Sequence, residues 1–98
     1  MTKALVAAIA ALTFSTANAG MDLIGQVAAK NHNSLTVQVA NQQYTVGVTP
    51  MTKIEAETRW DWDYRISFES IKIGEWVKID AYPVGQGQFF AEDIEVMR

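Results

Sequence analysis

The stretch SLTVQVANQQYTVGV, residues 34–48, decides the fold because apolar and polar side chains alternate along most of its length. A period of two indicates strands that each bury one face. Asn41 and Gln42 interrupt the alternation and provide a tight link between the two strands. The side chains expected to face inward are Leu35, Val37, Val39, Tyr44, Val46 and Val48. The stretch therefore predicts a β-hairpin.

The residues before the hairpin predict another strand. In IGQVAAK, residues 24–30, Val27 and Ala29 share a face with Gly25. A glycine inside a strand allows a bend or bulge where a barrel strand coils. The segment NHNS, residues 31–34, has the composition of a turn. Together with the hairpin, this strand predicts a three-stranded meander.

Two more strands are predicted downstream. Pro50 has no N–H to donate and ends the meander, and Ile54 marks a short following segment. In ESIKIGEWVKIDAYPV, residues 69–84, a glycine turn at Gly74 leads into a fourth main strand. Its inward residues, Val77, Ile79 and Ala81, alternate with Trp76, Lys78 and Asp80. We expect Pro83 to stop this strand, with Gly85 and Gly87 supplying the positive-φ positions of a hairpin.

The last strand, QFFAEDIEVMR at residues 88–98, changes parity. Phe89 and Ala91 share one face, whereas Ile94 and Val96 fall on the other if the strand is regular. A bulge near Glu92 and Asp93 returns both pairs to the interior. The core predicted from all strands is Val27, Leu35, Val37, Val46, Val77, Ile79, Ile94 and Val96.

The N-terminal residues have the features of a secretory signal peptide. Lys3 precedes an apolar run at residues 4–14, which is too short to span a bilayer, and Ala17 and Ala19 fit a signal peptidase. The alternative is an amphipathic first helix of a cytosolic domain, but residues 4–12 have no polar face. We therefore expect a signal peptide at residues 1–19, a mature domain at 20–98 and a periplasmic or secreted location.

Charge narrows the possible partners. Without Lys3, seven Lys and Arg residues remain against eleven Asp and Glu, and the formal net charge changes from −3 to −4. The basic residues are scattered, which argues against a basic stripe for nucleic acid or an anionic membrane. We expect no nucleic-acid partner and no membrane insertion after signal cleavage. The chain has no cysteine, so its small core relies on sheet closure.

The strand order and the early glycine are typical of an all-β fold, a small five- to six-stranded OB-like β-barrel after a cleaved signal peptide. The sequence also resembles a bacterial domain-of-unknown-function family of exported OB-like small β-barrels. The resemblance rests on GQV (25–27), LTV (35–37), YTV (44–46), TKI (52–54), IKIGEWV (71–77) and AEDIEV (91–96). These are fold-making residues, so the resemblance implies a scaffold and a compartment but no active site.

Residues 71–96 are also similar to the end of periplasmic copper-chaperone OB barrels. That resemblance implies Cu(I) ligands from one histidine and two methionines, with a tryptophan covering the metal. Here SLTVQV contains no histidine, and no M-x-M pair follows the second strand. His32, the only histidine, lies in the NHNS turn, and the methionines Met21, Met51 and Met97 are not paired with it at a ligand spacing.

The candidate binding segment is TRWDWDYRIS, residues 58–67. In an extended chain Trp60, Trp62 and Tyr64 project to one side, with Arg59, Asp61, Asp63 and Arg65 on the other. We expect one tryptophan to be packed and the other to lie at the rim. Asp61 and Asp63 form a D-x-D pair with few of the oxygen ligands that Ca²⁺ needs, and pairing with the arginines is the alternative.

The sequence thus predicts a non-enzymatic binding or interaction module for an unknown periplasmic ligand or protein partner. Its candidate contacts are Trp60, Trp62, Tyr64, Asp61 and Asp63. No catalytic residue, metal ligand or cofactor is predicted, because one turn histidine and no cysteine leave few nucleophile-base pairs. A periplasmic metal-binding protein of copper type is the alternative, and a small hydrolase is the third possibility.

Overall fold

The computed structural model describes residues 20–58, 63–85 and 87–98, and this part of the chain is almost entirely β. The predicted signal peptide, residues 1–19, and residues 59–62 of the candidate binding segment lie outside the described residues. The first strands are β2 (Met21–Lys30), β3 (Ser34–Val39) and β4 (Gln42–Gly47). Then come β5 (Lys53–Glu57), β6 (Asp63–Arg65) and a 3₁₀ turn η3 (Phe68–Ser70). The long hairpin of β7 (Trp76–Gly85) and β8 (Gln88–Met97) follows.

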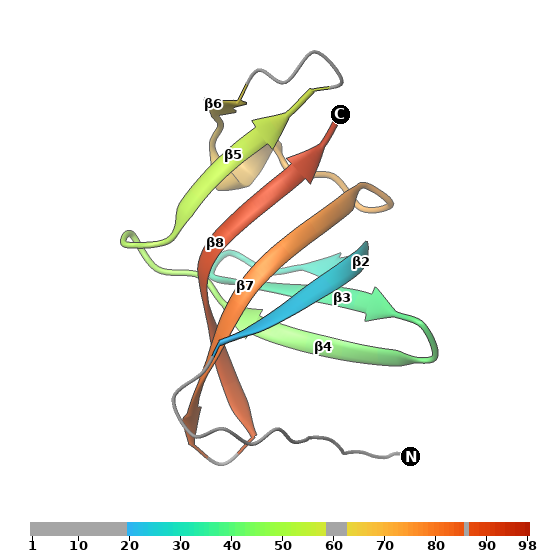
Figure 1. Ribbon diagram of the computed structural model, residues 1–98, viewed down its shortest axis with the longest axis vertical. Coiled ribbons are helices and arrows are strands. Elements are labelled where there is room, and N and C mark those ends of the chain that lie inside the picture. Colours follow the sequence, from blue (N-terminus) through green and yellow to red (C-terminus); the bar gives the residue numbers. More distant parts are fainter. Residues whose placement is uncertain (1–19, 59–62, 86) are drawn as a thin grey trace.

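Five of these strands close into a barrel (Figure 1). The sheet runs β4, β3, β2, β7, β8, and β4 returns to pair with β8 in parallel. This seam joins Val46 to Phe89 and Gly47 to Phe90. Beyond the barrel, β5 adds to β8 in parallel and β6 adds to β5. The predicted all-β barrel is therefore confirmed, with two extra strands on its sheet.

The barrel interior is filled by the residues that the alternation predicts. All eight predicted core residues are buried in one cluster. They are joined there by further buried side chains, namely Leu23, Ile54, Ile71, Ala81 and Ala91, while Ala56 is also buried. The outward positions between them, such as Lys78 and Gln38, are partly exposed.

Gly25 lies where β2 passes close to its neighbour, while the irregularity of this strand lies further along, between Val27 and Ala29. The β2 strand pairs with β3 on one side and with β7 on the other, so it must coil between them. A Cβ on Gly25 would overlap the backbone carbonyl oxygen of Gln38 and lie 3.1 Å from Cγ1 of Val37. The close approach of two strand backbones therefore requires glycine here.

The prediction that Ala29 shares a face with Gly25 and Val27 is wrong. The β2 to β3 register shifts between Val27 and Ala29, and Ala29 is exposed opposite Thr36. Lys30 instead lies opposite the buried Leu35. The irregularity sends Lys30 to the end of the barrel, where its ammonium group donates to backbone carbonyls.

Two further boundaries differ from the prediction. The link between β3 and β4 is formed by Ala40 and Asn41, with Ala40 at φ 55°, and Gln42 already belongs to β4. The β7 strand does not stop at Pro83 but continues to Gly85. Pairing with β2 reaches only Ala81, so Pro83 has a free strand edge, where its missing N–H breaks no bond.

The glycine and bulge predictions for the last hairpin are confirmed. Gly85 and Gly87 adopt positive φ values of 110° and 75°. Asp80 pairs with Asp93 and Ala81 with Ala91, which leaves Glu92 without an opposite residue. Ile94 and Val96 are consequently buried.

The segment around η3 closes one end of the barrel. Ile71 is buried, and Ile66 and Phe68 pack against the core. Lys30 Nζ donates to the carbonyl oxygens of Glu69 (3.0 Å) and Ile71 (2.7 Å) and lies 5.5 Å from the Phe68 ring centroid. One basic side chain of β2 thus holds the carbonyls at the end of η3.

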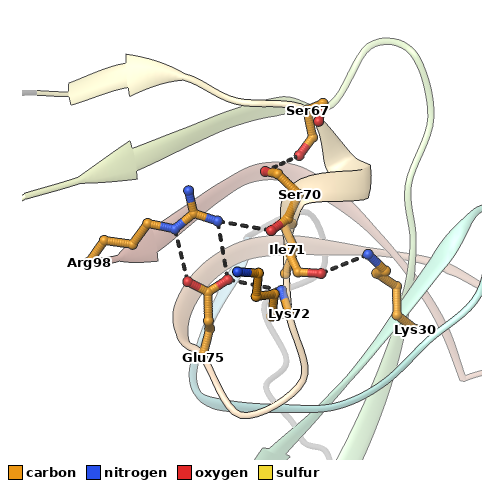
Figure 2. A network of polar contacts seen from close by, with 7 residues as sticks. All are labelled: Lys30, Ser67, Ser70, Ile71, Lys72, Glu75 and Arg98. Atoms are coloured by element: carbon orange, nitrogen blue, oxygen red, sulfur yellow. Dashed lines mark hydrogen bonds and ion pairs between the residues drawn. The ribbon is translucent and has the colours of Figure 1, made fainter.

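A second basic side chain, Arg98, which follows the end of β8, holds the same segment (Figure 2). Arg98 donates to Ser70 O (3.0 Å) and to both carboxylate oxygens of Glu75 (2.8 and 3.2 Å). The Lys72 N–H also donates to Glu75, at 2.9 Å. Hydrogen bonding to Arg98 lowers the pKa of Glu75. Within the described residues, no helix has the length and apolar character needed to cross a membrane.

Candidate functional site

The candidate site is the outer face of β2, β7, β8 and β5, which the strand registers arrange in rows. Because neighbouring inward residues are buried, alternate positions on each strand project outward. Successive rows along a strand are about 7 Å apart. We call this surface the outer face, and its described residues are Asp22, Ile24, Gln26, Lys53, Glu55, Glu57, Trp76, Lys78, Asp80, Tyr82, Phe90, Asp93, Glu95 and Met97.

The central row contains three aspartates on three adjacent strands, and it ends on β5 with Lys53 opposite Asp93. Asp80 of β7 lies opposite Asp22 of β2 on one side and Asp93 of β8 on the other. We call these three residues the acidic row. Like charges directly opposite each other destabilise a sheet. The fold therefore keeps this row at a cost in stability.

The carboxylates of the acidic row lie close enough to affect one another's ionisation and hydrogen bonding. A hydrogen bond with Asp22, together with burial and nearby carboxylates, raises the pKa of Asp80 to about 6. Oδ1 of Asp93 is buried and has no hydrogen-bond partner within the described residues. The row thus contains acceptor capacity that the described part of the protein leaves unused.

The adjacent row mixes charges. Lys78 lies opposite Ile24 on β2 and Glu95 on β8. Together with Asp80 and Asp93, Lys78 and Glu95 line a shallow depression of about 50 Å³. Burial, assisted by the charge of Glu57, raises the pKa of Glu95. Lys78 is therefore surrounded by three carboxylates in this depression, while the second lysine of the outer face, Lys53, forms an ion pair with Glu55 at 3.7 Å.

Exposed apolar side chains lie on both sides of these charged rows. Trp76 is 52% exposed, and it lies opposite Met97, which is 40% exposed. On the other side Tyr82, 40% exposed, faces Phe90 with ring centroids 6.4 Å apart. Phe90 in turn lies against Gly47 at the barrel seam. Large side chains that remain this exposed are frequent in contact surfaces.

Charge is distributed unevenly around the barrel. Residues 31–52, which include β3 and β4, contain no Asp, Glu, Lys or Arg. The rows of the outer face, continued onto β6, contain seven acidic residues and three basic ones. The acidic ones are Asp22, Glu55, Glu57, Asp63, Asp80, Asp93 and Glu95, and the basic ones are Lys53, Arg65 and Lys78. The negative charge of the protein is therefore concentrated on this face.

Only part of the predicted binding segment falls within the described residues. Asp63 and Tyr64 are both exposed in β6. Asp63 lies opposite Glu57, at the margin of the outer face, whereas Tyr64 lies opposite the buried Ala56 and contacts Arg98. Their partners on β5 place these two residues on opposite sides of β6. Arg59, Trp60, Asp61 and Trp62 lie outside the described residues.

Comparison with known proteins places this geometry in a family. The family described as Domain of unknown function (DUF5666) matches residues 24–95. The chain belongs to the DUF5666 family. No curated protein and no solved structure matches it significantly. The match spans all five barrel strands in whole or in part, and within the acidic row it includes Asp80 and Asp93 but not Asp22.

The site of this DUF5666 domain could be found only in part from the sequence. Its alternation identified Trp76, Lys78 and Asp80 as outward residues of one strand. Asp22 of β2 and Asp93 of β8 lie next to Asp80 in the sheet, and this proximity follows only from the strand registers.

The described part of this DUF5666 domain does not contain a cluster of metal-ligating side chains. No group of three or more His, Cys, Asp or Glu side chains suited to a metal ion occurs among the described residues. His32 is exposed in its turn, and Met51 is 88% exposed.

The pKa of Asp80 predicts an unusual pH dependence of stability. A carboxyl whose folded pKa is raised stabilises the fold most below its unfolded pKa, near 3.8, and this stabilisation is lost as the pH rises through about 6. The melting temperature should therefore be higher at pH 5 than at pH 7. Asp80→Asn should raise it at pH 7 and flatten this dependence. Asp80 is exposed, so screening limits the gain to less than about 1 kcal/mol, or a few degrees.

Circular dichroism melts at pH 5, 6 and 7 measure this effect. Asp63→Asn is the matched control, because Asp63 is exposed at the margin of the same face. A lower melting temperature for Asp80→Asn at pH 7, or an unchanged pH dependence, would contradict the prediction.

Proposed function

We propose that this protein is an exported, non-enzymatic, OB-like binding module whose outer face binds a cationic ligand. The observation that carries the proposal is the acidic row, with exposed aromatic side chains on both sides of it. The carboxylates of the acidic row repel one another and weaken the sheet when no ligand is bound. A bound cation forms charge-assisted hydrogen bonds with them.

The OB-like assignment is supported by strand connectivity. The barrel starts with a three-stranded meander, β2, β3 and β4, and its last two strands return to flank it. The third barrel strand, β4, pairs in parallel with the fifth, β8. A five-stranded barrel of this kind suits the OB architecture, in which ligands are bound on exposed strands and loops.

The non-enzymatic part of the proposal rests on composition. The chain has one histidine and no cysteine, which limits nucleophilic catalysis. The outer face has many carboxylates, and the depression between Lys78, Asp80, Asp93 and Glu95 is shallow. A flat, charged surface suits recognition of a partner better than reaction on a small substrate.

Export is supported by the sequence of residues 1–19. Lys3, the apolar run at 4–14 and the small residues Ala17 and Ala19 fit a cleaved leader. Mass spectrometry of the protein from a periplasmic extract should find a chain that begins at Gly20. An intact Met1 terminus in that fraction would overturn this part of the proposal.

Ligand binding is tested with immobilised poly-lysine and poly-glutamate. The protein should bind poly-lysine but not poly-glutamate. Binding to poly-lysine should weaken as salt is raised from about 20 to 300 mM, because the interaction is between charges. The double variant Asp80→Asn, Asp93→Asn should reduce it at least fivefold. Glu69→Gln, which removes an exposed carboxylate outside the outer face, is the matched control. Equal loss in both variants, or no binding to poly-lysine, would refute the proposal.

A further inference from the structure

The geometry points to an extended basic segment of a partner protein as the ligand of the outer face, lying along β7 with alternate side chains directed at successive rows. This inference rests on the proposed function and narrows its ligand to one chemical class. Three features of the face support it: its charge, its row spacing and the position of its aromatic residues.

The negative charge of the outer face favours a cationic ligand. Seven acidic side chains against three basic ones give the outer-face rows and β6 an excess of negative charge. A second copy of this chain would bring the same excess onto it, and nucleic acids or anionic lipids are repelled in the same way. A basic polypeptide segment is complementary, because its ammonium or guanidinium groups form charge-assisted hydrogen bonds with carboxylates.

The spacing of the rows along β7 favours a ligand with an extended polypeptide chain. Trp76, Lys78, Asp80 and Tyr82 all project outward from β7, and Trp76 and Tyr82 are about 20 Å apart along the strand. Alternate side chains of an extended peptide are about 7 Å apart, which equals the spacing of the rows. A peptide can therefore place apolar residues at both aromatic positions and basic residues at the two rows between them, where Asp80 and Asp93 lie in one row and Glu95 lies beside Lys78 in the other.

The aromatic residues distinguish a peptide from a simple polycation. Trp76 and Met97 on one side, and Tyr82 on the other, remain exposed around the charged rows, with Phe90 partly buried beside Tyr82. A polyamine or poly-lysine neutralises the carboxylates but has no apolar side chains to cover these groups. Apolar residues at the two ends of a basic segment bury this surface and add to affinity.

The test uses a palindromic peptide that alternates Thr with Leu, Lys, Lys and Leu, in the order L-T-K-T-K-T-L, so that either direction along β7 places its side chains at the rows. Its isomer K-T-L-T-L-T-K has the same composition and charge but exchanges the apolar and basic positions. Dissociation constants for both peptides, and for spermine and poly-lysine, are measured by titration of the purified protein with NMR detection.

The first peptide should bind at least threefold more tightly than its isomer. Trp76→Ala and Tyr82→Ala should each weaken its binding at least fivefold but leave poly-lysine binding within twofold. Both side chains are exposed, so these variants should remain folded. Met51→Ala, which removes an apolar side chain that is 88% exposed outside the outer face, should change neither.

The outcomes separate this inference from the function on which it rests. Equal affinity for the two peptides, or no effect of the aromatic substitutions, would overturn the inference and leave a general cation-binding face. Failure of every cationic probe to bind would overturn both.

Discussion

Gly25→Ala should destabilise the protein by about 3 kcal/mol or more, a large share of the roughly 5–15 kcal/mol that small domains have. The new Cβ would overlap the carbonyl oxygen of Gln38, which is backbone and cannot rotate away. Relief requires β2 to move away from β3, which breaks the ladder where Gln26 pairs with Gln38. Urea unfolding followed by tryptophan fluorescence measures the loss.

The control for this substitution is Ile24→Ala in the same strand. Ile24 projects to the outer face and is 52% exposed, so its truncation should cost less than about 1 kcal/mol. If Gly25→Ala and Ile24→Ala unfold at the same urea concentration, β2 does not pass as closely over β3 as described.

Ile79→Ala should cost about 2–4 kcal/mol, because it leaves a cavity at the centre of the barrel. Ile79 is fully buried on β7, opposite Leu23 of β2 and Ile94 of β8. These neighbours belong to a closed barrel and cannot collapse freely into the vacated volume. Thermal or urea unfolding should show the loss as an earlier, still cooperative transition.

Gln38→Ala provides the comparison for Ile79→Ala. Gln38 projects outward from β3 and is only partly buried, with side-chain hydrogen bonds to Ala40 and Gln43 at the surface. Its truncation should cost less than about 1 kcal/mol. A larger loss for Gln38→Ala than for Ile79→Ala would mean that the inward and outward faces are exchanged.

Side-chain alternation was sufficient to predict the barrel core because burial in a strand repeats every two residues. It also located the β8 bulge, since only an extra residue at Glu92 buries both Ala91 and Ile94. The irregularity in β2 had no such signal. It places Lys30 against carbonyls of Glu69 and Ile71, about forty residues away, and local patterning contains no information on that contact.

The candidate site was harder to predict for the same reason. The sequence draws attention to residues 58–67, where aromatic and acidic residues are contiguous. The acidic row has one residue on each of three strands, and Asp22 and Asp80 are far apart in the chain. Like-charge neighbours across a sheet become visible only when the strand registers are known.

The parallel seam between β4 and β8 has a kinetic consequence. It consists of two residue pairs, and each joins positions more than forty residues apart, whereas the β3–β4 and β7–β8 hairpins form from local contacts. Loop closure over that distance is slow relative to hairpin formation, so the seam should close late in folding. Until it closes, β4 and β8 expose free edges that can pair with another chain. The packing of Phe90 against Gly47 therefore also protects the folded protein from intermolecular strand exchange.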